Sequence, residues 1–334
     1  MRIVKTKCLL LVDQNTFIIT LISLQKTSMH TQFKTKDGVK LHGQIFTAEC
    51  PKATIILNPG TATKTSFYIP FAQFLASKDY SVMLWNYRGF CESRTASLAT
   101  SSILFSDIGR WDIPAAIQHA QSIFTDLPLY CIGHSAGGQQ LGFAHNCNQL
   151  SGMIAIAAST GYFGGMPLSY RLKAKFFFKV FSPISTALFG YVRCKAFNFM
   201  EDLPPKLAQE WGRWCRKENF FFDTSLAQHD PWLRTYRQFE FPIHVLTADD
   251  DEISTHFNTN GLWKNIRSTQ PIQFHCYVSA GMPKRHIGHF GYFRRSHQSI
   301  WLDILNRLET MHEQLCVTPV VHPPTTEKAT FCSN

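Results

Sequence analysis

The chain has 334 residues, of which 45% are hydrophobic, 13% aromatic and 17% charged. That composition supplies a sizeable core and excludes wholesale disorder and coiled coil, which both need a more polar or more charged chain. No long uninterrupted apolar stretch occurs, which excludes a polytopic membrane protein. The 33 lysines and arginines against 23 acids give a formal net charge of +10. This charge is compatible with nucleic acid, a membrane surface or acidic ligands, and it does not choose among them.

The ten cysteines stand singly along the chain. No pair of them has the spacing of a zinc or redox motif, so we expect reduced thiols and a cytoplasmic protein. For the same reason we expect no metal and no other cofactor.

Residues 1–31 are interpreted as an N-terminal extension. They begin with a basic and then apolar run that superficially suggests a signal peptide, but the polar residues 13–15 interrupt it and no small-residue cleavage site follows. A membrane anchor would place an acidic residue inside the bilayer at considerable cost. We therefore expect the domain to begin near Gln32, with Met1 and Met29 both open as the start of translation.

From residue 32 onward, short β-branched runs alternate with longer amphipathic stretches, which is typical of an α/β protein with a parallel sheet. The Asp37-Gly38 turn inside FKTKDGVKLHGQIF predicts a hairpin. The further predicted strands, in chain order, are ATIILNPG, SVMLWNY, LYCIGHS, GMIAIAA, PIHVLTA and IQFHCYV. Helices are predicted over about 67–77, 111–124, from 136 onward, and 299–308.

A different composition marks residues 160–240, which hold 12 of the 28 phenylalanines and 12 basic against 7 acidic residues. Because this segment interrupts the chain between two predicted strands, above their carboxyl ends, we expect a helical lid. The core is then formed by residues 32–159 and 241–313. Most of the aromatic residues are expected to pack the lid against the sheet rather than to contact a ligand. Residues 314–334, with several prolines and threonines and no periodicity, predict a flexible tail.

The strongest local signal is GHSAG at residues 133–137, a G-x-S-x-G pattern between a predicted strand and a predicted helix. Such a sharp turn forces the central serine into strained backbone geometry and projects its side chain above the sheet. The glycines are needed because a Cβ atom there would clash across the turn. Ser135 is therefore the predicted nucleophile, and the helix N-terminus directs main-chain N–H groups, including that of Ala136, toward developing negative charge.

A serine hydroxyl needs a base to take its proton and an acid to orient that base. His289 follows the last predicted strand within IGHFG, where glycines allow the loop to approach the serine, so it is the predicted base. His286 and His297 are interpreted as loop or surface histidines. The strand PIHVLTA ends in three aspartates, and a carboxylate at that edge can accept the other N–H of the histidine. Asp251 is the first choice for this acid and Asp250 the alternative.

The second oxyanion donor is expected in the loop after ATIILNPG. Pro59 has no N–H to give, so the main-chain N–H of Thr61, or of Ala62, is the candidate beside that of Ala136. Removing one such donor typically lowers turnover about a hundredfold.

These motifs resemble those of the α/β-hydrolase superfamily. GHSAGG is similar to its nucleophile elbow, ADDDEIS to its acid loop and GHFGYF to its histidine loop. NYRGFCES resembles its Arg-Gly-x-Gly-x-Ser loop, with Cys91 in place of the second glycine. A second departure is Asn58-Pro59, where many relatives have His-Gly. The similarity runs from about Gln32 to His312, and EDLPPKLAQEWGRWCR resembles poorly characterised bacterial hydrolases near the serine-aminopeptidase-like and lysophospholipase-like group.

The resemblance implies the α/β-hydrolase fold: a mostly parallel eight-stranded sheet flanked by helices, with a helical lid insertion. It also implies a triad of Ser135, His289 and Asp251. The activity that follows is a serine hydrolase, esterase-like or thioesterase-like, acting through an acyl-enzyme. The phenylalanine-rich lid favours a hydrophobic acyl group, and its excess of basic residues favours an anionic head such as coenzyme A or a phospholipid.

Two alternatives stay open, an acyltransferase that uses the same triad and a non-catalytic binding protein on a hydrolase scaffold. The sequence does not choose an oligomeric state. No nucleic-acid partner is expected, because the basic residues are dispersed and no aromatic-basic RNA motif or zinc finger occurs. Membrane association is not expected either, since Lys173, Lys175 and Lys179 are interpreted as a solvated face.

Overall fold

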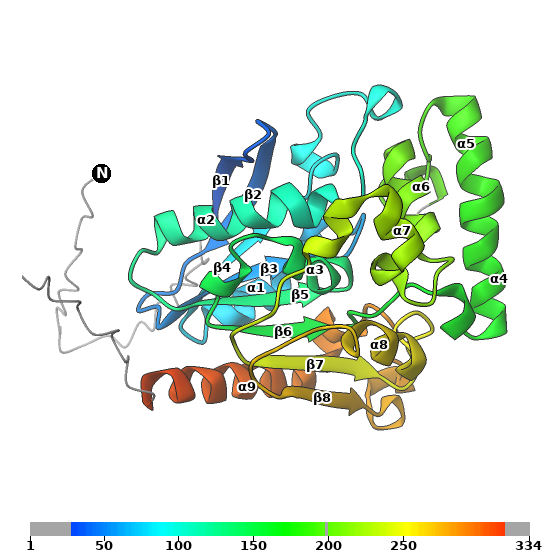
Figure 1. Cartoon of the computed structure of the whole chain (residues 1–334). Helices are drawn as coiled ribbons and strands as arrows, with labels where there is room; N and C mark the ends of the chain where they lie inside the picture. Colours follow the sequence, from blue (N-terminus) through cyan, green and yellow to red (C-terminus); the bar gives the residue numbers. More distant parts are fainter. Residues whose placement is uncertain (1–27, 198–199, 318–334) are drawn as a thin grey trace, which may run out of the picture.

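The computed structural model describes residues 28–197 and 200–317. The expectations for residues 1–27 and 318–334 lie outside the described residues. The described chain forms one sheet of eight strands in the order β1-β2-β4-β3-β5-β6-β7-β8 (Figure 1). The strands are β1 (Ser28–Lys34), β2 (Lys40–Phe46), β3 (Ala53–Asn58), β4 (Tyr80–Trp85), β5 (Leu129–His134), β6 (Gly152–Ile156), β7 (Ile243–Ala248) and β8 (Ile272–Tyr277).

The sheet is mostly parallel. β1 pairs with β2 and β2 with β4 in antiparallel fashion, whereas every neighbouring pair from β4 across to β8 is parallel. The predicted hairpin is the β1–β2 pair, and Gly38 occupies the turn with a φ of 87° that suits glycine. The expected mostly parallel sheet of eight strands is therefore confirmed.

Helices cover both faces of this sheet. α1 (Ile69–Ala76) and α9 (Gln298–Val317) pack on one face, whereas α2 (Ile113–Ile123) and α8 (His256–Trp263) belong to the core on the other. β3, β4 and β5 are buried along their whole length. Strands covered on both sides need apolar residues at every position, which explains their continuous hydrophobic runs.

Three boundaries differ from the sequence-based expectation. β1 begins at Ser28, four residues before the expected start at Gln32, because residues 28–32 pair with residues 42–46 of β2. The last helix continues to Val317, beyond the predicted end of the helix at residue 308 and the expected end of the core at residue 313, and Met311 in its final turns is buried against the core.

The third difference concerns the helix after the serine. α3 (Ala136–Gln139) has a single turn and is followed by a 3-10 turn at Leu141–Phe143. Gly142, within that turn, packs directly against the ring of Tyr236, so this position has no room for a side chain. A Cβ atom at Gly142 would lie only 2.2 Å from that ring.

Between β6 and β7 the described residues form four α-helices, in the segment expected to be a lid. We call residues 160–240 the helical insertion. Its helices are α4 (Leu168–Phe176), α5 (Ser182–Phe189), α6 (Pro205–Trp214) and α7 (Thr224–His229). In Figure 1, α4 and α5 form one long helix at the right-hand edge, with α6 and α7 between it and the sheet.

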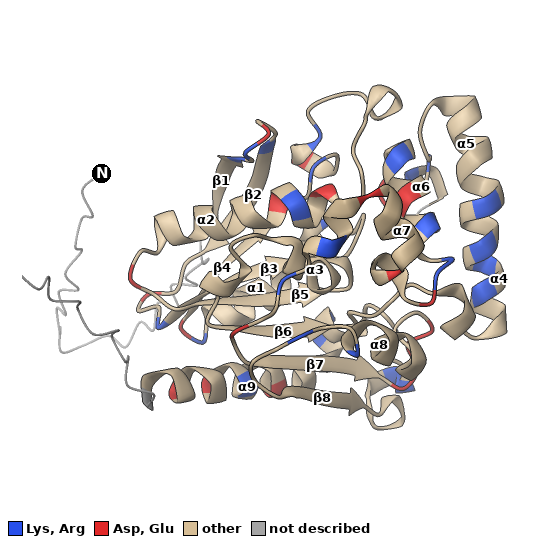
Figure 2. Ribbon diagram, viewed as in Figure 1, with Lys and Arg blue, Asp and Glu red and all other residues tan. Residues whose placement is uncertain are grey.

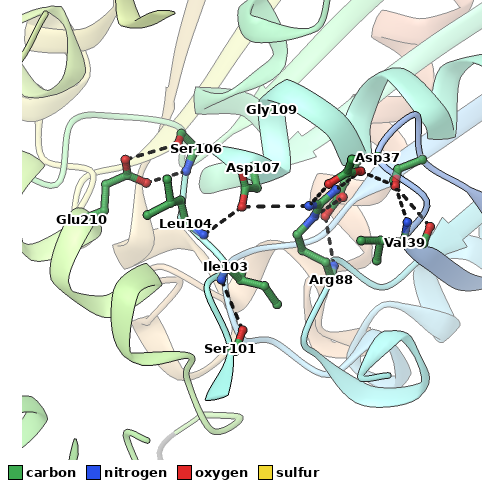
Figure 3. Close-up of polar contacts among 12 residues, drawn as sticks. Asp37, Val39, Arg88, Ser101, Ile103, Leu104, Ser106, Asp107, Gly109 and Glu210 are labelled. Atoms are coloured by element: carbon green, nitrogen blue, oxygen red, sulfur yellow. Dashed lines mark hydrogen bonds and ion pairs between the residues drawn. The ribbon is translucent and has the colours of Figure 1, made fainter. Parts of the chain in front are cut away.

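Buried polar contacts join the helical insertion and the first hairpin to the core (Figure 3). Glu210 on α6 accepts hydrogen bonds from the Ser106 N–H at 2.8 Å and the Ser106 hydroxyl at 3.2 Å. Arg88, in the loop after β4, pairs through Nε with Asp112 at 2.6 Å and through Nη1 with Asp37 at 2.7 Å. The Arg88 and Asp112 side chains are almost completely buried. Removal of Arg88 would therefore leave the Asp112 carboxyl group in the interior without its partner, whereas Arg88 without Asp112 would keep its pair with Asp37.

Candidate active site

Ser135 lies between the end of β5 and the start of α3. Its backbone has φ 50° and ψ −116°, a strained conformation for a residue with a side chain. The glycines around it have no room for a Cβ atom: at Gly133 it would lie 2.7 Å from the backbone of Gly137, and at Gly137 it would lie 2.5 Å from the carbonyl oxygen of Asn58. The motif therefore forms the sharp strand-to-helix turn that presents a serine side chain above the sheet edge.

The predicted base and acid form a direct pair at the same edge of the sheet. His289 Nδ1 lies 2.9 Å from Asp251 Oδ2, and the Asp251 carboxylate also accepts hydrogen bonds from the N–H groups of Ile253 and Ser254. Burial alone would raise the pKa of Asp251, but His289 and these N–H donors outweigh it and hold the pKa below its usual value. Asp251 is thus a buried carboxylate whose charge is balanced, and it can fix the orientation and tautomer of the imidazole.

Asp250, the alternative acid, contacts a different histidine. Its carboxylate lies 2.7 Å from His286 Nδ1 and accepts the N–H groups of Ile287 and Gly288, both at 2.9 Å. Gly288 has a φ of 56°, and a Cβ atom there would meet the His286 ring at 2.8 Å. Asp250 therefore holds the loop that carries His289 against the acid loop, and does not contact His289 itself.

The residue that precedes the serine, His134, contacts His289. The ring of His134 lies 5.1 Å from the ring of His289, and His134 Nε2 lies 2.8 Å from the His289 carbonyl oxygen. Within the described part of the chain, the Ser135 hydroxyl makes no hydrogen bond to the imidazole. Nucleophile–base bonds are often long in unliganded enzymes and shorten in the complex with substrate.

A chain of hydrogen bonds, not foreseen from the sequence, connects three loops of the site through His134. The Gly60 N–H donates to Tyr68 Oη at 2.8 Å, and Tyr68 Oη lies 2.7 Å from His134 Nδ1. Since the tyrosine oxygen already accepts from Gly60, its own proton goes to Nδ1, which leaves Nε2–H to donate to the His289 carbonyl. Burial and the neighbouring His289 lower the pKa of His134 to about 3, so its ring is neutral.

The loop after β3 carries the expected second oxyanion donor. Among the described residues, no group accepts a hydrogen bond from the main-chain N–H of Thr61 or Ala136. The Thr61 hydroxyl oxygen is also buried without a partner. Asn58 anchors this loop: its side chain donates to the Gly137 carbonyl at 3.3 Å and accepts from Trp85 Nε1 at 3.0 Å. Asn58, at the end of β3, thus has a structural role. This role accounts for one departure from the superfamily pattern, Asn58-Pro59.

The other departure, Cys91, lies in the loop after β4. Its φ is 46°, the left-handed region in which glycine has no steric penalty and other residues do. The conformation that a glycine would adopt at this point is therefore kept although the residue has changed.

No group of three or more histidine, cysteine or acidic side chains within residues 28–197 and 200–317 is placed to hold a metal ion. In the same part of the chain, no helix combines the length and the apolar character that a membrane span requires.

Comparison with known proteins agrees with this fold. The family model described as serine aminopeptidase, S33, matches residues 49–210, which include the Thr61 loop and the Ser135 turn. The sequence matches none of the curated proteins.

Several solved structures are similar in fold at low sequence identity. A soluble variant of monoglyceride lipase from Saccharomyces cerevisiae, in complex with a substrate analogue, has a TM-score of 0.59 and 13% identity, covering 86% of this chain and 96% of that one. The esterase Pf2001 from Pyrococcus furiosus has a TM-score of 0.57 and 13% identity, covering 85% and 91%. An esterase from Exiguobacterium antarcticum has a TM-score of 0.52 and 14% identity, covering 84% and 100%.

The fold is that of the α/β-hydrolases, and residues 49–210 are similar to the serine aminopeptidase, S33, family.

Proposed function

We propose that the protein is a serine hydrolase that cleaves a carboxylic ester or thioester through an acyl-enzyme intermediate. The observation that carries this proposal is the buried His289–Asp251 pair, at 2.9 Å, in the loop next to the strained Ser135 turn. A structural serine has no need of strained geometry or of a neighbouring imidazole paired with a carboxylate. A nucleophilic serine needs both.

In the proposed reaction, Ser135 Oγ attacks the carbonyl carbon while His289 Nε2 takes its proton. The negative charge that develops on the carbonyl oxygen is stabilised by the N–H groups of Thr61 and Ala136, which have no partner among the described residues. The tetrahedral intermediate collapses, and the leaving alcohol or thiol takes the proton from His289. Water, activated by the same imidazole, then hydrolyses the ester bond to Ser135 and restores the free enzyme.

The helical insertion supports a hydrophobic acyl group. The segment before α4 lies against the residues that follow the acid loop, since Thr255 Oγ1 donates to the Gly165 carbonyl oxygen at 2.9 Å. Apolar side chains from the insertion, including Phe163, Phe220 and Phe221, are buried in the core that contains Ala136. These rings pack the insertion against the core, and it is the apolar composition of the insertion as a whole that supports a hydrophobic acyl group.

The test is hydrolysis of p-nitrophenyl butyrate and of a thioester analogue by the full chain. We expect Ser135→Ala and His289→Ala to lower kcat/KM by at least about a thousandfold with unchanged circular dichroism. The control is His145→Ala, which removes an exposed imidazole outside the His289 loop and keeps most of the activity. Full activity in Ser135→Ala would exclude the proposed mechanism.

A further inference from the structure

The outermost part of the helical insertion is one continuous helix, residues 168–189, which we call the outer helix. It consists of α4, a π-helical turn at Phe177–Phe181, and α5. Gly190, in the left-handed conformation, ends it. At 1.5 Å per residue it is about 33 Å long, and Figure 1 shows it along the edge of the molecule, away from the sheet.

Large apolar side chains are exposed along the whole outer helix at intervals of four residues. The exposed fractions are 66% for Leu168, 58% for Leu172, 59% for Phe176, 40% for Val180, 54% for Ile184 and 70% for Leu188. In a regular α-helix, residues four apart are not fully aligned, so a row of such residues winds slowly around the helix. The π-helical turn, whose hydrogen bonds span five residues, reduces this winding. The outcome is a nearly continuous apolar stripe in contact with solvent, an arrangement that marks an interaction surface.

The stripe is not the face through which the outer helix packs on the rest of the protein. The opposite side of the outer helix supplies the packing: Tyr170, Ala174, Phe177 and Phe181 lie against the buried core. The ring of Phe178 packs edge-on against Trp211 of α6 at 5.1 Å. The outer helix therefore has an apolar face toward the protein and a second apolar face toward solvent.

The charges around the stripe have one sign. Residues 161–200 contain six lysines and arginines and no aspartate or glutamate. Lys173, Lys175 and Lys179 are exposed beside the stripe, and Figure 2 shows basic bands along α4 and the middle of the outer helix. A protein partner of mixed charge has no particular match to such a surface, whereas a bilayer with anionic headgroups offers an apolar interior beneath a negative plane.

We propose that the outer helix docks on the surface of an anionic lipid bilayer, with the Leu168–Leu188 stripe inserted below the headgroups and Lys173, Lys175 and Lys179 on the phosphate plane. The spacing of these lysines alone favours a solvated face. The exposure of six large apolar side chains beside them is what changes that interpretation. The surface does not depend on the proposed esterase activity, but it would bring the acid-loop end of the insertion next to lipid.

The test is co-sedimentation of the full chain with vesicles, using the Ser135→Ala variant so that lipid hydrolysis cannot change the membrane. We expect binding to vesicles of phosphatidylcholine mixed with phosphatidylserine, and much weaker binding to phosphatidylcholine alone. The triple change Lys173→Gln, Lys175→Gln and Lys179→Gln should lower the partition coefficient on the order of a hundredfold. The change Leu172→Ser with Phe176→Ser should lower it at least about tenfold.

Matched controls separate docking from general attraction of a basic protein. Lys34→Gln, Lys36→Gln and Lys40→Gln remove the same charge from the first hairpin, and Leu302→Ser removes an exposed apolar side chain from α9; both should bind as the parent does. Equal loss in these controls, or no binding to the anionic vesicles, would overturn the proposal. So would a dimer in light scattering that Leu172→Ser with Phe176→Ser abolishes, because the stripe would then be covered by a second copy.

Discussion

His134 makes the stability of this protein depend on pH in a way that can be calculated. Its ring is buried, and burial together with His289 lowers its pKa to about 3, whereas an unfolded histidine has a pKa of about 6.5. Below about pH 6.5 the unfolded chain therefore binds a proton that the folded protein does not bind. The stabilisation is complete above that pH and is lost progressively as the pH falls toward about 3.

Between about pH 7.5 and pH 5, the free-energy difference from this one group is RT ln(1 + 10^1.5), or about 2 kcal/mol. The perturbation is His134→Gln, which does not titrate and keeps an amide donor for the His289 carbonyl. The assay is urea unfolding of both proteins at each pH. The variant should be less stable than the wild type at pH 7.5, because it loses the bond from Tyr68, and the gap should narrow by about 2 kcal/mol at pH 5.

The control is His145→Gln, which replaces an exposed histidine and should follow the wild-type curve at both pH values. A gap between wild type and His134→Gln that stays constant with pH would refute the reasoning, because it would mean that the folded protein protonates His134 as readily as the unfolded chain does.

Three other changes test the remaining parts of the structure. Asp251→Asn should lower kcat about ten-thousandfold because the histidine loses its carboxylate, whereas Asp250→Asn, which affects only the loop contacts, should cost far less. Cys91→Gly should raise the free energy of unfolding by up to about 1 kcal/mol because it relieves the left-handed backbone. Arg88→Met should lower the free energy of unfolding by about 3–5 kcal/mol because it leaves Asp112 buried without its partner.

Each of these changes has a specific control or contradictory outcome. Equal losses of kcat in the Asp250 and Asp251 variants would contradict the assignment of the acid. Cys91→Ala removes the same thiol and keeps the strained backbone. If Cys91→Ala raised the free energy of unfolding as much as Cys91→Gly does, relief of the left-handed conformation would not be the source of the gain. The double change Arg88→Met with Asp112→Leu should recover much of the loss seen in Arg88→Met, and no recovery would contradict the ion-pair interpretation.

Local sequence patterns predicted the parts of the structure that depend on neighbours in the chain. The Asp37-Gly38 turn, the individual strands in their order along the chain and the strand-to-helix turn at Ser135 all follow from residues within a short window. The pairing of Asp251 with His289, by contrast, was predicted only because the order of motifs resembles that of the α/β-hydrolases. Nothing in the spacing of 38 residues brings these two side chains together.

Two features could not be predicted for physical reasons. Tyr68 and His134 are 66 residues apart, and their bond depends on how α1 packs beneath the elbow. The second feature is the exposure of the apolar stripe on the outer helix. Apolar residues four apart normally indicate a face toward the core, yet here that stripe faces solvent. The helix has a competing apolar face, which includes Tyr170 and Phe181, and only the packing shows which of the two is buried.

The most direct measurement of the central claim is the site of covalent labelling by a fluorophosphonate, which reacts only with an activated serine. Incubation of the full chain followed by intact-mass and peptide analysis should show a single adduct, on Ser135, which His289→Ala slows strongly and Ser135→Ala abolishes. A folded protein that takes no label, or takes it on another residue, would show that Ser135 is not a nucleophile.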